Sequence, residues 1–276
     1  MKKLPLVSVI IPTRNSEEFL GNCLESVKMQ AYKNVEIIVV DNNSTDKTKE
    51  IAVKYTKSVF NKGPERSAQR NFGAGKSKGD YLLFIDSDME LSKKVVEECV
   101  DRVQKSTGII IPEKSMGEGF WAQCKGLGRS FYIGGVRIEA PRFFSKEVFN
   151  KFKGYDETQT GTEDYDLPQR IKEEFGENSI LRINSFIYHH EGRLSLFDTL
   201  KKKFYYAKTA GVYTTRKSNE EYSKKQSNIL ERYKLYFSHP KKLFKNPFFG
   251  LGVLFMKTAE LGMLGVGYSI AKFLGR

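Results

Sequence analysis

The sequence predicts a doubly wound α/β fold with a mostly parallel sheet, followed by a C-terminal helical extension that associates with a membrane. Strand and helix patterns alternate over the first two-thirds of the chain, and three strands end in polar or acidic residues. Residues 194–276 hold 16 Lys or Arg against 5 Asp or Glu, which is +11 of the total charge of +13. We therefore expect a sheet domain at 1–193, a basic amphipathic helical region at 194–246 and an apolar membrane-associated segment at 247–276.

The clearest strand is Tyr81–Ile85, which has no polar alternation and is typical of a strand buried on both faces. It is followed by Asp86 and Asp88, at the strand end where open α/β sheets bind ligands. Two carboxylates separated by one residue can hold a hard divalent cation, and that cation can hold a diphosphate. A lone Asp-x-Asp more often marks a polar turn than a cation site. The surrounding sequence is therefore needed to distinguish a turn from a cation site.

The other elements follow in order. Leu6–Ile11 predicts the first strand, closed by Pro12, and Asn15 or Ser16 can cap the helix after it. The remaining expected elements are strands at 35–40, 59–60 and 108–111, helices near 47–55, 67–74 and 91–103, and a loop at 113–128. This alternation indicates right-handed crossovers between parallel strands.

Several classes of protein are excluded or disfavoured. No GxGxxG motif follows the first strand and no P-loop motif is present, which argues against a dinucleotide cofactor and a P-loop nucleotide site. Three cysteines without CxxC spacing indicate a reducing compartment and no zinc site. The N-terminus lacks the apolar run of a signal peptide, so we expect the sheet domain in the cytoplasm.

Three motifs carry a family resemblance. The stretches Val7–Asn15, Ile37–Asp46 and Asp86–Asp88, in this order, resemble the nucleotide-sugar half of family 2 glycosyltransferases, which have the GT-A fold. The resemblance covers roughly residues 5–193. It implies a metal-dependent transferase of the hexosyltransferase type, with Mn²⁺ or Mg²⁺ as the divalent cation and a nucleoside-diphosphate sugar as the donor.

The resemblance also implies which residues bind the donor. Asp41 is expected to contact the base of the nucleotide, Arg66 and Arg70 lie in the region that approaches the base and phosphates, and the backbone near 133–144 approaches the sugar. The implied nucleotide-sugar-binding residues are Pro12, Thr13, Arg14, Asn15, Asp41, Asn43, Arg66, Arg70, Asp86 and Ser87.

The catalytic and metal-binding residues are implied in the same way. Glu163 and Asp164 begin a predicted helix, where acidic residues commonly complement the helix dipole. In the family this acidic pair contains the general base, which we assign to Asp164, with Glu163 beside it. The implied metal ligands are Asp88 and Asp86 together with one of two histidines, His189 as first choice and His190 as second.

The C-terminal region has a different character. Residues 194–215 combine lysines with an apolar face, as in helices that bind membrane surfaces, and a segment of about 25 residues at 248–273 is long enough to cross a bilayer. Lys257 and Glu260 can pair on one face of it, yet each charge near the bilayer centre costs about 2.5–3.5 kcal/mol. A spanning helix, an interfacial or re-entrant helix pair, a helix packed in an oligomer and a helical subdomain on the sheet domain all remain open.

The functional prediction combines these parts. We expect transfer of a sugar, with inversion, from the donor to a membrane-borne, lipid-linked or glycan acceptor in glycan biosynthesis at the cytoplasmic face of the cell membrane. Anionic lipid headgroups are the expected partner of the basic tail. Nucleic acid is not expected, because the sheet domain is nearly neutral, and an oligomer is compatible with the composition. A polyprenyl-phosphate sugar synthase and a nucleotidyltransferase are the alternatives, and a haloacid-dehalogenase-type phosphatase and a non-catalytic membrane-binding module are weaker rivals.

Overall fold

The computed structural model describes residues 4–134, 139–159, 161–215 and 229–273, and it divides into two compact units. The first, the sheet unit, comprises Met1–Glu113, Ala140–Glu157 and Glu163–His189. The second, the helical unit, comprises Lys114–Glu139, Thr158–Thr162 and His190–Arg276. The last segment of the helical unit begins close to the boundary expected at residue 193, but this unit also contains Lys114–Glu139, which the sequence analysis placed in the sheet domain.

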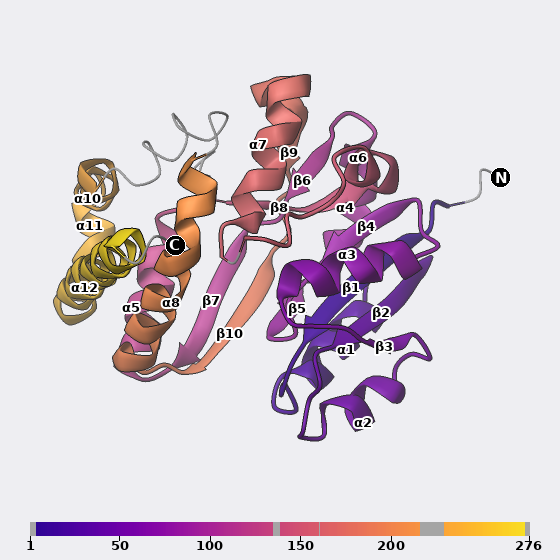
Figure 1. Cartoon of the computed structure of the whole chain (residues 1–276), viewed down its shortest axis with the longest axis horizontal. Helices are drawn as coiled ribbons and strands as arrows, with labels where there is room; N and C mark the ends of the chain where they lie inside the picture. The colour runs from indigo at the N-terminus through magenta and orange to yellow at the C-terminus, as the bar shows by residue number, and fades with distance from the viewer. Residues whose placement is uncertain (1–3, 135–138, 160, 216–228, 274–276) are drawn as a thin grey trace. The chain divides into compact units, whose positions relative to one another are not determined.

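The sheet unit contains a seven-stranded sheet of order β3-β2-β1-β4-β8-β6-β9 (Figure 1). The strands are β1 Val7–Thr13, β2 Val35–Asp41, β3 Val59–Asn61, β4 Tyr81–Phe84, β6 Gly108–Ile110, β8 Pro141–Ser145 and β9 Ile180–Arg182. The pairs β1–β2, β2–β3, β1–β4 and β6–β9 are parallel, and β8 is antiparallel to both of its neighbours. The prediction of a GT-A-like α/β sheet is confirmed, and the sheet is mixed because β8 reverses direction.

Helices cover both faces of this sheet, which explains why its central strands read as continuous apolar runs. On β1, Val7, Val9 and Ile11 belong to one core cluster, whereas Ile10 belongs to the other. The first cluster includes side chains of α1 Leu20–Lys28, α2 Thr48–Val53 and α4 Val95–Val103, and the second includes side chains of α3 Arg66–Lys76, α6 Lys146–Lys151 and α7 Glu163–Phe175. Both cores therefore hold the β1 and β4 ends in fixed positions.

A second sheet has three strands, in the order β5-β10-β7. They are β5 Met89–Leu91, β10 Ile187–Arg193 and β7 Glu113–Glu118. In the pairing of β5 with β10, His189 lies opposite Met89. The expected loop at 113–128 is wrong, because these residues form β7 and most of α5 Gly119–Ser130. The many glycines suggested a loop, but apolar side chains such as Trp121 and Cys124 recur at helical spacing and pack into a core.

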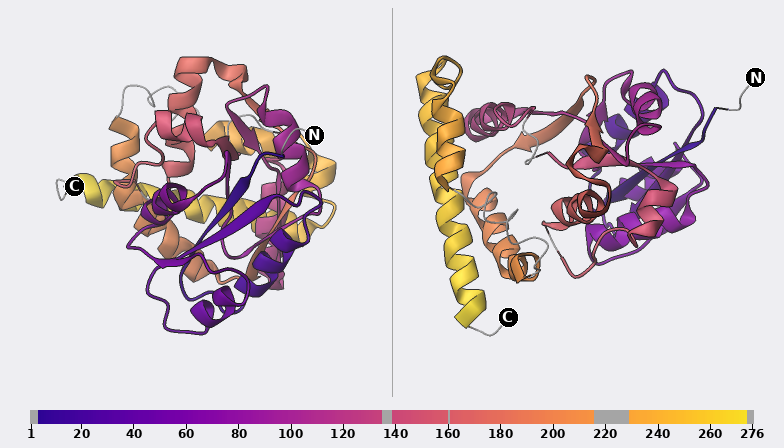
Figure 2. Two further views of the ribbon diagram at one scale, coloured as in Figure 1. Left: turned by 90° about the vertical axis from the view of Figure 1, so that its right-hand side faces the viewer. Right: turned by 90° about the horizontal axis from the view of Figure 1, so that it is seen from above.

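The helical unit is built on α5, α8 Leu196–Thr215, α10 Ile229–Phe237, α11 Pro240–Leu243 and α12 Pro247–Phe273. Helix α12 lies beside α5 and α8 (Figure 2). Cys124 of α5, Tyr236 of α10 and Val253 of α12 share one apolar core. The expected pair within α12 is present, since Lys257 Nζ lies 2.8 Å from Glu260 Oε2. By length and composition, Pro247–Gly267 could cross a membrane, and of the described residues it is the one such segment.

Two helix boundaries differ from the sequence prediction. Helix α1 begins at Leu20 rather than at a cap on Asn15 or Ser16, because Asn15 has a positive φ of 47° and Ser16–Phe19 forms a turn before the helix. Leu91 belongs to β5, so the helix expected from residue 91 begins at Val95.

Parts of the expected sugar-facing stretch (135–138) and of the polar connection after α8 (216–228) lie outside the described residues.

Candidate active site

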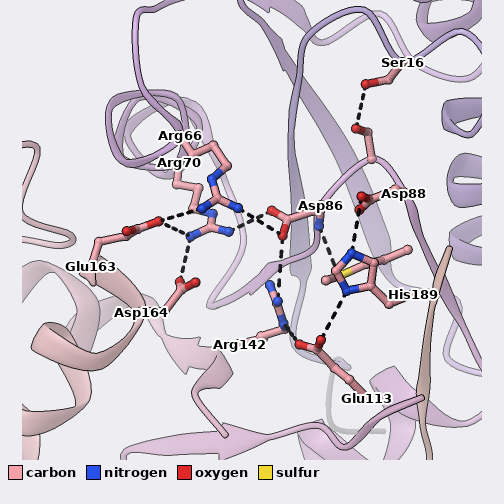
Figure 3. A network of polar contacts seen from close by, with 12 residues as sticks. Ser16, Arg66, Arg70, Asp86, Asp88, Glu113, Arg142, Glu163, Asp164 and His189 are labelled. Atoms are coloured by element: carbon pink, nitrogen blue, oxygen red, sulfur yellow. Dashed lines mark hydrogen bonds and ion pairs between the residues drawn. The ribbon is translucent and has the colours of Figure 1, made fainter. Parts of the chain in front are cut away.

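The Asp-x-Asp motif lies between β4 and β5, at the carboxyl end of β4. Strand β4 runs parallel to β1 and in register with it, so the loop after β1 and the motif meet at one sheet edge. Ser16 of that loop and Ser87 of the motif are joined by a 2.9 Å hydrogen bond between their hydroxyl groups (Figure 3). The sheet therefore brings together two of the segments that the resemblance assigned to the donor.

Asp86 is surrounded by three arginines. Arg70 Nη2 donates to Asp86 Oδ1 at 2.7 Å, and guanidinium nitrogens of Arg66 and Arg142 each lie 3.7 Å from Asp86 Oδ2. Burial alone would raise the pKa of Asp86, but Arg70, Arg142 and Arg66 hold this pKa well below its ordinary value. Asp86 is therefore ionised, and it orients the three guanidinium groups at the sheet edge.

The predicted acidic pair, Glu163 and Asp164, contacts two of the same arginines. Asp164 Oδ1 accepts a 2.7 Å hydrogen bond from Arg70 Nη1, and Glu163 Oε1 lies 3.4 Å from Arg66 Nη2. Both carboxylates are in the first turn of α7, where the helix dipole also favours negative charge. Burial, and then the nearby Asp164 charge, raise the pKa of Glu163 against the effect of the arginines. Arg70 thus ties the candidate base to the Asp-x-Asp motif.

Asp88 is part of a chain of contacts with groups from three other strands (Figure 3). Its Oδ2 lies 3.3 Å from His189 Nε2 of β10, and His189 Nδ1 lies 3.4 Å from Glu113 Oε2 of β7. Arg142 Nε of β8 donates to Glu113 Oε1 at 2.7 Å. Because Arg142 also contacts Asp86, the two motif carboxylates are linked through three further side chains.

The remaining donor-binding candidates gather at the ends of β1 and β2. Thr13 pairs with Asp41 in the sheet, and Asp41 Oδ2 accepts from the backbone N–H of Ser44 at 2.9 Å. Asn15 Oδ1 accepts from the backbone N–H of Thr45 at 2.9 Å. Pro12 and Thr13 are buried at the end of β1, Arg14 and Asn15 are exposed beyond it, and Asn43 is exposed after β2 and bonded to Asn61. These residues form a second cluster, joined to the first by the Ser16–Ser87 hydrogen bond.

The structure distinguishes the two histidines by their places on β10. His189 contacts Asp88 and Glu113. His190 is the next residue of the same strand, and successive side chains of a strand point to opposite faces. His189, the first choice, is therefore the histidine in contact with the Asp-x-Asp motif.

Two residues of this network, Glu113 and Arg142, were not predicted from the sequence. Glu113 follows the apolar run Gly108–Ile111 and Pro112, so it was a carboxylate at a strand end, the same signal that identified Asp86. Arg142 gave no comparable signal, because a single arginine inside an apolar strand has many structural roles. The pairing of β8 with β4 brings Arg142 close to Asp86, and the sequence alone does not show this pairing.

The side chains around Asp88 suit a divalent cation that is also bound by substrate phosphates. No group of three or more His, Cys, Asp or Glu side chains that could hold a metal ion occurs among the described residues. However, Mg²⁺ is commonly bound by one or two carboxylates together with substrate phosphates rather than by a complete protein cage. Asp88 Oδ1 is buried and has no hydrogen-bond partner among the described residues. The 3.3 Å between Asp88 and His189 is close to the roughly 3 Å between adjacent ligands of an octahedral cation, so the residues fit.

The charge of the cluster also suits a cation. The network contains five carboxylates, those of Asp86, Asp88, Glu113, Glu163 and Asp164, and the three guanidinium groups of Arg66, Arg70 and Arg142. With every carboxylate ionised, the net charge is −2. A bound diphosphate would add further negative charge, which a divalent cation would offset.

Comparison with known proteins decides the family. The family model described as Glycosyl transferase family 2 matches residues 8–202. The chain belongs to this family. The recognition of a family 2 glycosyltransferase from three motifs is confirmed.

Related proteins and solved structures agree with this assignment. An uncharacterized glycosyltransferase of Rickettsia typhi is 25% identical over 83% of this chain and 72% of its own length. One of Haemophilus influenzae is 38% identical over 34% of this chain and 41% of its length. A teichoic acid poly(glycerol phosphate) polymerase of Staphylococcus epidermidis is 27% identical over 53% of the chain and 20% of its length. Matches to the Haemophilus protein and to two Streptococcus pneumoniae glycosyltransferases span 15–41% of those relatives.

The similar structures support the fold. A mannosyltransferase of Pyrobaculum calidifontis, solved with GDP-Man and Mn²⁺, is 16% identical and superposes with a TM-score of 0.61, covering 98% of this chain and 81% of that one. Staphylococcus aureus TarS with UDP gives a TM-score of 0.52 at 17% identity, covering 98% and 92%. At these identities the likeness establishes the GT-A-like fold and not the substrate.

Proposed function

We propose that the protein transfers a sugar from a nucleoside-diphosphate sugar, with the help of Mn²⁺ or Mg²⁺, to a lipid-linked acceptor at the cytoplasmic face of a membrane. The observation that carries this proposal is the contact of Asp88 with His189 beside the Asp86–arginine network. In this contact one carboxylate with an unpartnered buried oxygen lies next to an imidazole, at the sheet edge where the loops proposed to bind the nucleotide also lie. Similar structures contain Mn²⁺ or Mg²⁺ with nucleotides, which is in line with this arrangement.

The donor side of the site is assigned to the sheet edge. Asp88 and His189 would hold the cation, which supplies positive charge to the leaving diphosphate when bound. Asp41 and the exposed Asn15 and Asn43 would recognise the nucleoside. Arg66 has a side chain that is 37% exposed, so it can reach a phosphate, whereas Arg70 is buried and orients the carboxylates around it.

The acceptor side is assigned to Asp164. Its side chain is 28% exposed, and Arg70 contacts only Oδ1, so an acceptor hydroxyl can approach the other oxygen and give up its proton there. Glu163 would remain beside it, with a pKa that burial and the nearby Asp164 charge raise. Attack on the side opposite the leaving diphosphate would invert the anomeric carbon.

Membrane association is proposed for the helical unit. Helix α12 contains a segment long and apolar enough to cross a bilayer, and Phe248, Leu251 and Phe255 on it are exposed. Basic side chains such as Lys201, Lys202 and Lys241 are exposed in the same unit and would attract anionic headgroups. The relative that polymerises teichoic acid, a cell-envelope polymer, supports an acceptor at the cell membrane.

The experiment that tests this proposal uses the full-length protein with Mn²⁺ or Mg²⁺ and a panel of UDP- and GDP-sugars, and measures the nucleoside diphosphate released by slow donor hydrolysis. We expect release from a small subset of donors, which stops when the cation is chelated. Release that continues in excess chelator would contradict the role of the cation. Formation of pyrophosphate when the protein is instead given a nucleoside triphosphate and a sugar 1-phosphate would identify a nucleotidyltransferase.

A further inference from the structure

Glu113 and His189 are in contact although 76 residues separate them in the chain. His189 Nδ1 faces Glu113 Oε2 at 3.4 Å, while Nε2, the other ring nitrogen, faces Asp88 Oδ2 at 3.3 Å. An imidazole therefore lies between two carboxylates, with one ring nitrogen toward each. The question is which carboxylate receives the N–H of the ring.

We infer that Glu113 is the positioning residue for the cation site: it accepts the Nδ1–H of His189, and thereby turns the unprotonated Nε2 toward Asp88 and the cation. The inference rests on the proposed function, in which a divalent cation binds at Asp88 and His189. It names a residue and a role that the three sequence motifs do not contain. Metal-binding histidines commonly donate their second ring N–H to a carboxylate in this way, which fixes the tautomer and the ring orientation.

The geometry on the Glu113 side favours this assignment. Glu113 is held by Arg142, whose Nε donates to Oε1 at 2.7 Å, while Oε2 faces the imidazole. The Arg142 and Glu113 side chains are only 11% and 21% exposed, which limits competition from water. The carboxylate that receives the Nδ1–H is therefore fixed by a neighbouring strand rather than by a mobile loop.

The geometry on the Asp88 side agrees with it. If Nδ1 carries the proton, Nε2 and Asp88 Oδ2 are two lone-pair atoms only 3.3 Å apart, and they repel each other unless a positive charge lies between them. The second oxygen of Asp88 is buried and has no hydrogen-bond partner among the described residues. A cation bound between His189 and Asp88 would explain both the short Nε2–Oδ2 distance and the unpartnered Oδ1.

Arg142 extends the arrangement to the other motif carboxylate. Its Nη2 lies 3.7 Å from Asp86 Oδ2, while its Nε binds Glu113. Asp86, Arg142, Glu113, His189 and Asp88 thus form a ring of contacts that begins and ends in one three-residue motif (Figure 3). The ring sets the orientation of His189 relative to Asp88 before any donor binds.

The test measures Mn²⁺ binding to the full-length protein in the presence of UDP or GDP, by the loss of the free Mn²⁺ signal in electron paramagnetic resonance. We expect Glu113→Leu to weaken Mn²⁺ binding by about 10–100-fold. Glu113→Gln keeps an acceptor oxygen but loses the charge, so it should lie between wild type and Glu113→Leu. Glu98→Gln is the matched control, because Glu98 is another hydrogen-bonded carboxylate of the sheet unit, bonded to Ser185, and its loss should leave Mn²⁺ affinity unchanged.

A second measurement does not depend on the variants folding. Nitrogen NMR of histidine-labelled wild type, with Mg²⁺ and nucleotide bound, should show the tautomer of His189 with the proton on Nδ1. Equal Mn²⁺ affinity of wild type and Glu113→Leu, or a proton on Nε2 of His189 in the wild type with Mg²⁺ and nucleotide bound, would overturn the inference. Wild type that binds no Mn²⁺ with either nucleotide would instead overturn the proposed cation site itself, so the two failures are distinguishable.

Discussion

The sheet unit and the helical unit both bury charged side chains, but they arrange them differently. In the sheet unit, Asp86 contacts arginines from α3 and β8, and Asp164 of α7 shares Arg70 with it. In the helical unit, Glu260 pairs with Lys257 three residues away on the same helix. The first arrangement exists only because several elements converge at a sheet edge, whereas the second can form in α12 alone.

The sheet-unit cluster also contains buried polar atoms that a ligand could bind. Asp88 Oδ1, Arg70 Nε and Glu163 Oε2 are buried atoms of the sheet unit without a hydrogen-bond partner among the described residues. A buried polar atom without a partner is destabilising, and it is expected where a ligand completes the hydrogen bonds. We propose that the sheet-unit cluster serves binding and catalysis, and that the Lys257–Glu260 pair serves the stability of α12. The predictions below test this distinction in order of their expected effect on sugar transfer.

The largest effect is expected for Asp88→Ala. Removing this carboxylate should lower transfer by at least about 10³-fold, because the positive charge that stabilises the leaving diphosphate is lost. Release of nucleoside diphosphate from the donor measures the change. Asp88 lies beyond the end of β4 and outside both cores, so the thermal unfolding temperature should stay close to that of wild type. Transfer at near wild-type rate would exclude Asp88 as a ligand.

Asp164→Asn should have the second largest effect. The amide keeps the shape and can still accept the hydrogen bond from Arg70, but it cannot take a proton. Turnover should fall by about 10²–10⁴-fold, whereas donor affinity measured by calorimetry should change little. Turnover close to wild type would point to an acceptor that is already anionic, as in a polyprenyl-phosphate sugar synthase.

The exposed apolar face of α12 should affect transfer only through the acceptor. Phe248, Leu251 and Phe255 are 77%, 60% and 59% exposed and lie on one side of the helix at spacings of three and four residues. Replacing all three with Gln should abolish flotation with anionic liposomes and transfer to a lipid-linked acceptor. Donor hydrolysis should be unchanged, since it needs only the sheet unit.

A control for this prediction is available on α10. Leu230 is 79% exposed but lies outside the apolar segment, so Leu230→Gln should leave flotation intact. Equal flotation of wild type and the triple variant would contradict the membrane role of this face.

The smallest effect on transfer is expected for Glu260→Gln. The variant leaves the Lys257 ammonium without its carboxylate partner in a position that is only 15% exposed, so the free energy of unfolding should fall by about 3 kcal/mol. Denaturant unfolding in detergent measures this change. Donor hydrolysis by the folded protein should stay at the wild-type rate. A large loss of hydrolysis without a loss of stability would show that this pair, too, belongs to the catalytic machinery.

Much of the sheet unit could be predicted from the sequence, because its signals are local. Predominantly apolar runs predicted β1, β2 and β4, and the polar residues after them predicted the sheet edge on which the candidate site lies. The reversed strand β8 was not recognisable, since the apolar pattern of Phe143–Phe144 is the same in either direction. The glycines of α5 suggested a loop because their low helix propensity was outweighed by packing that the sequence does not display.

The site was predictable where function is carried by a motif and not where it depends on topology. Asp86, Asp88, Asp164 and His189 lie in recognisable motifs or beside them. Glu113 and Arg142 acquire their roles only when β7 and β8 are placed next to β10 and β4. Long-range strand pairing of this kind has no local signature in the sequence.

The central claim is that a divalent cation and Asp88 together hold the diphosphate of the donor at the sheet edge. The most direct measurement is calorimetric titration of UDP and GDP into the full-length protein, with Mn²⁺ or with excess chelator, for wild type and Asp88→Asn. We predict that one nucleotide binds wild type in the presence of Mn²⁺, and that chelation or the substitution weakens this binding by at least about tenfold. Equal nucleotide affinity of wild type with Mn²⁺, wild type with chelator and Asp88→Asn with Mn²⁺ would contradict the claim.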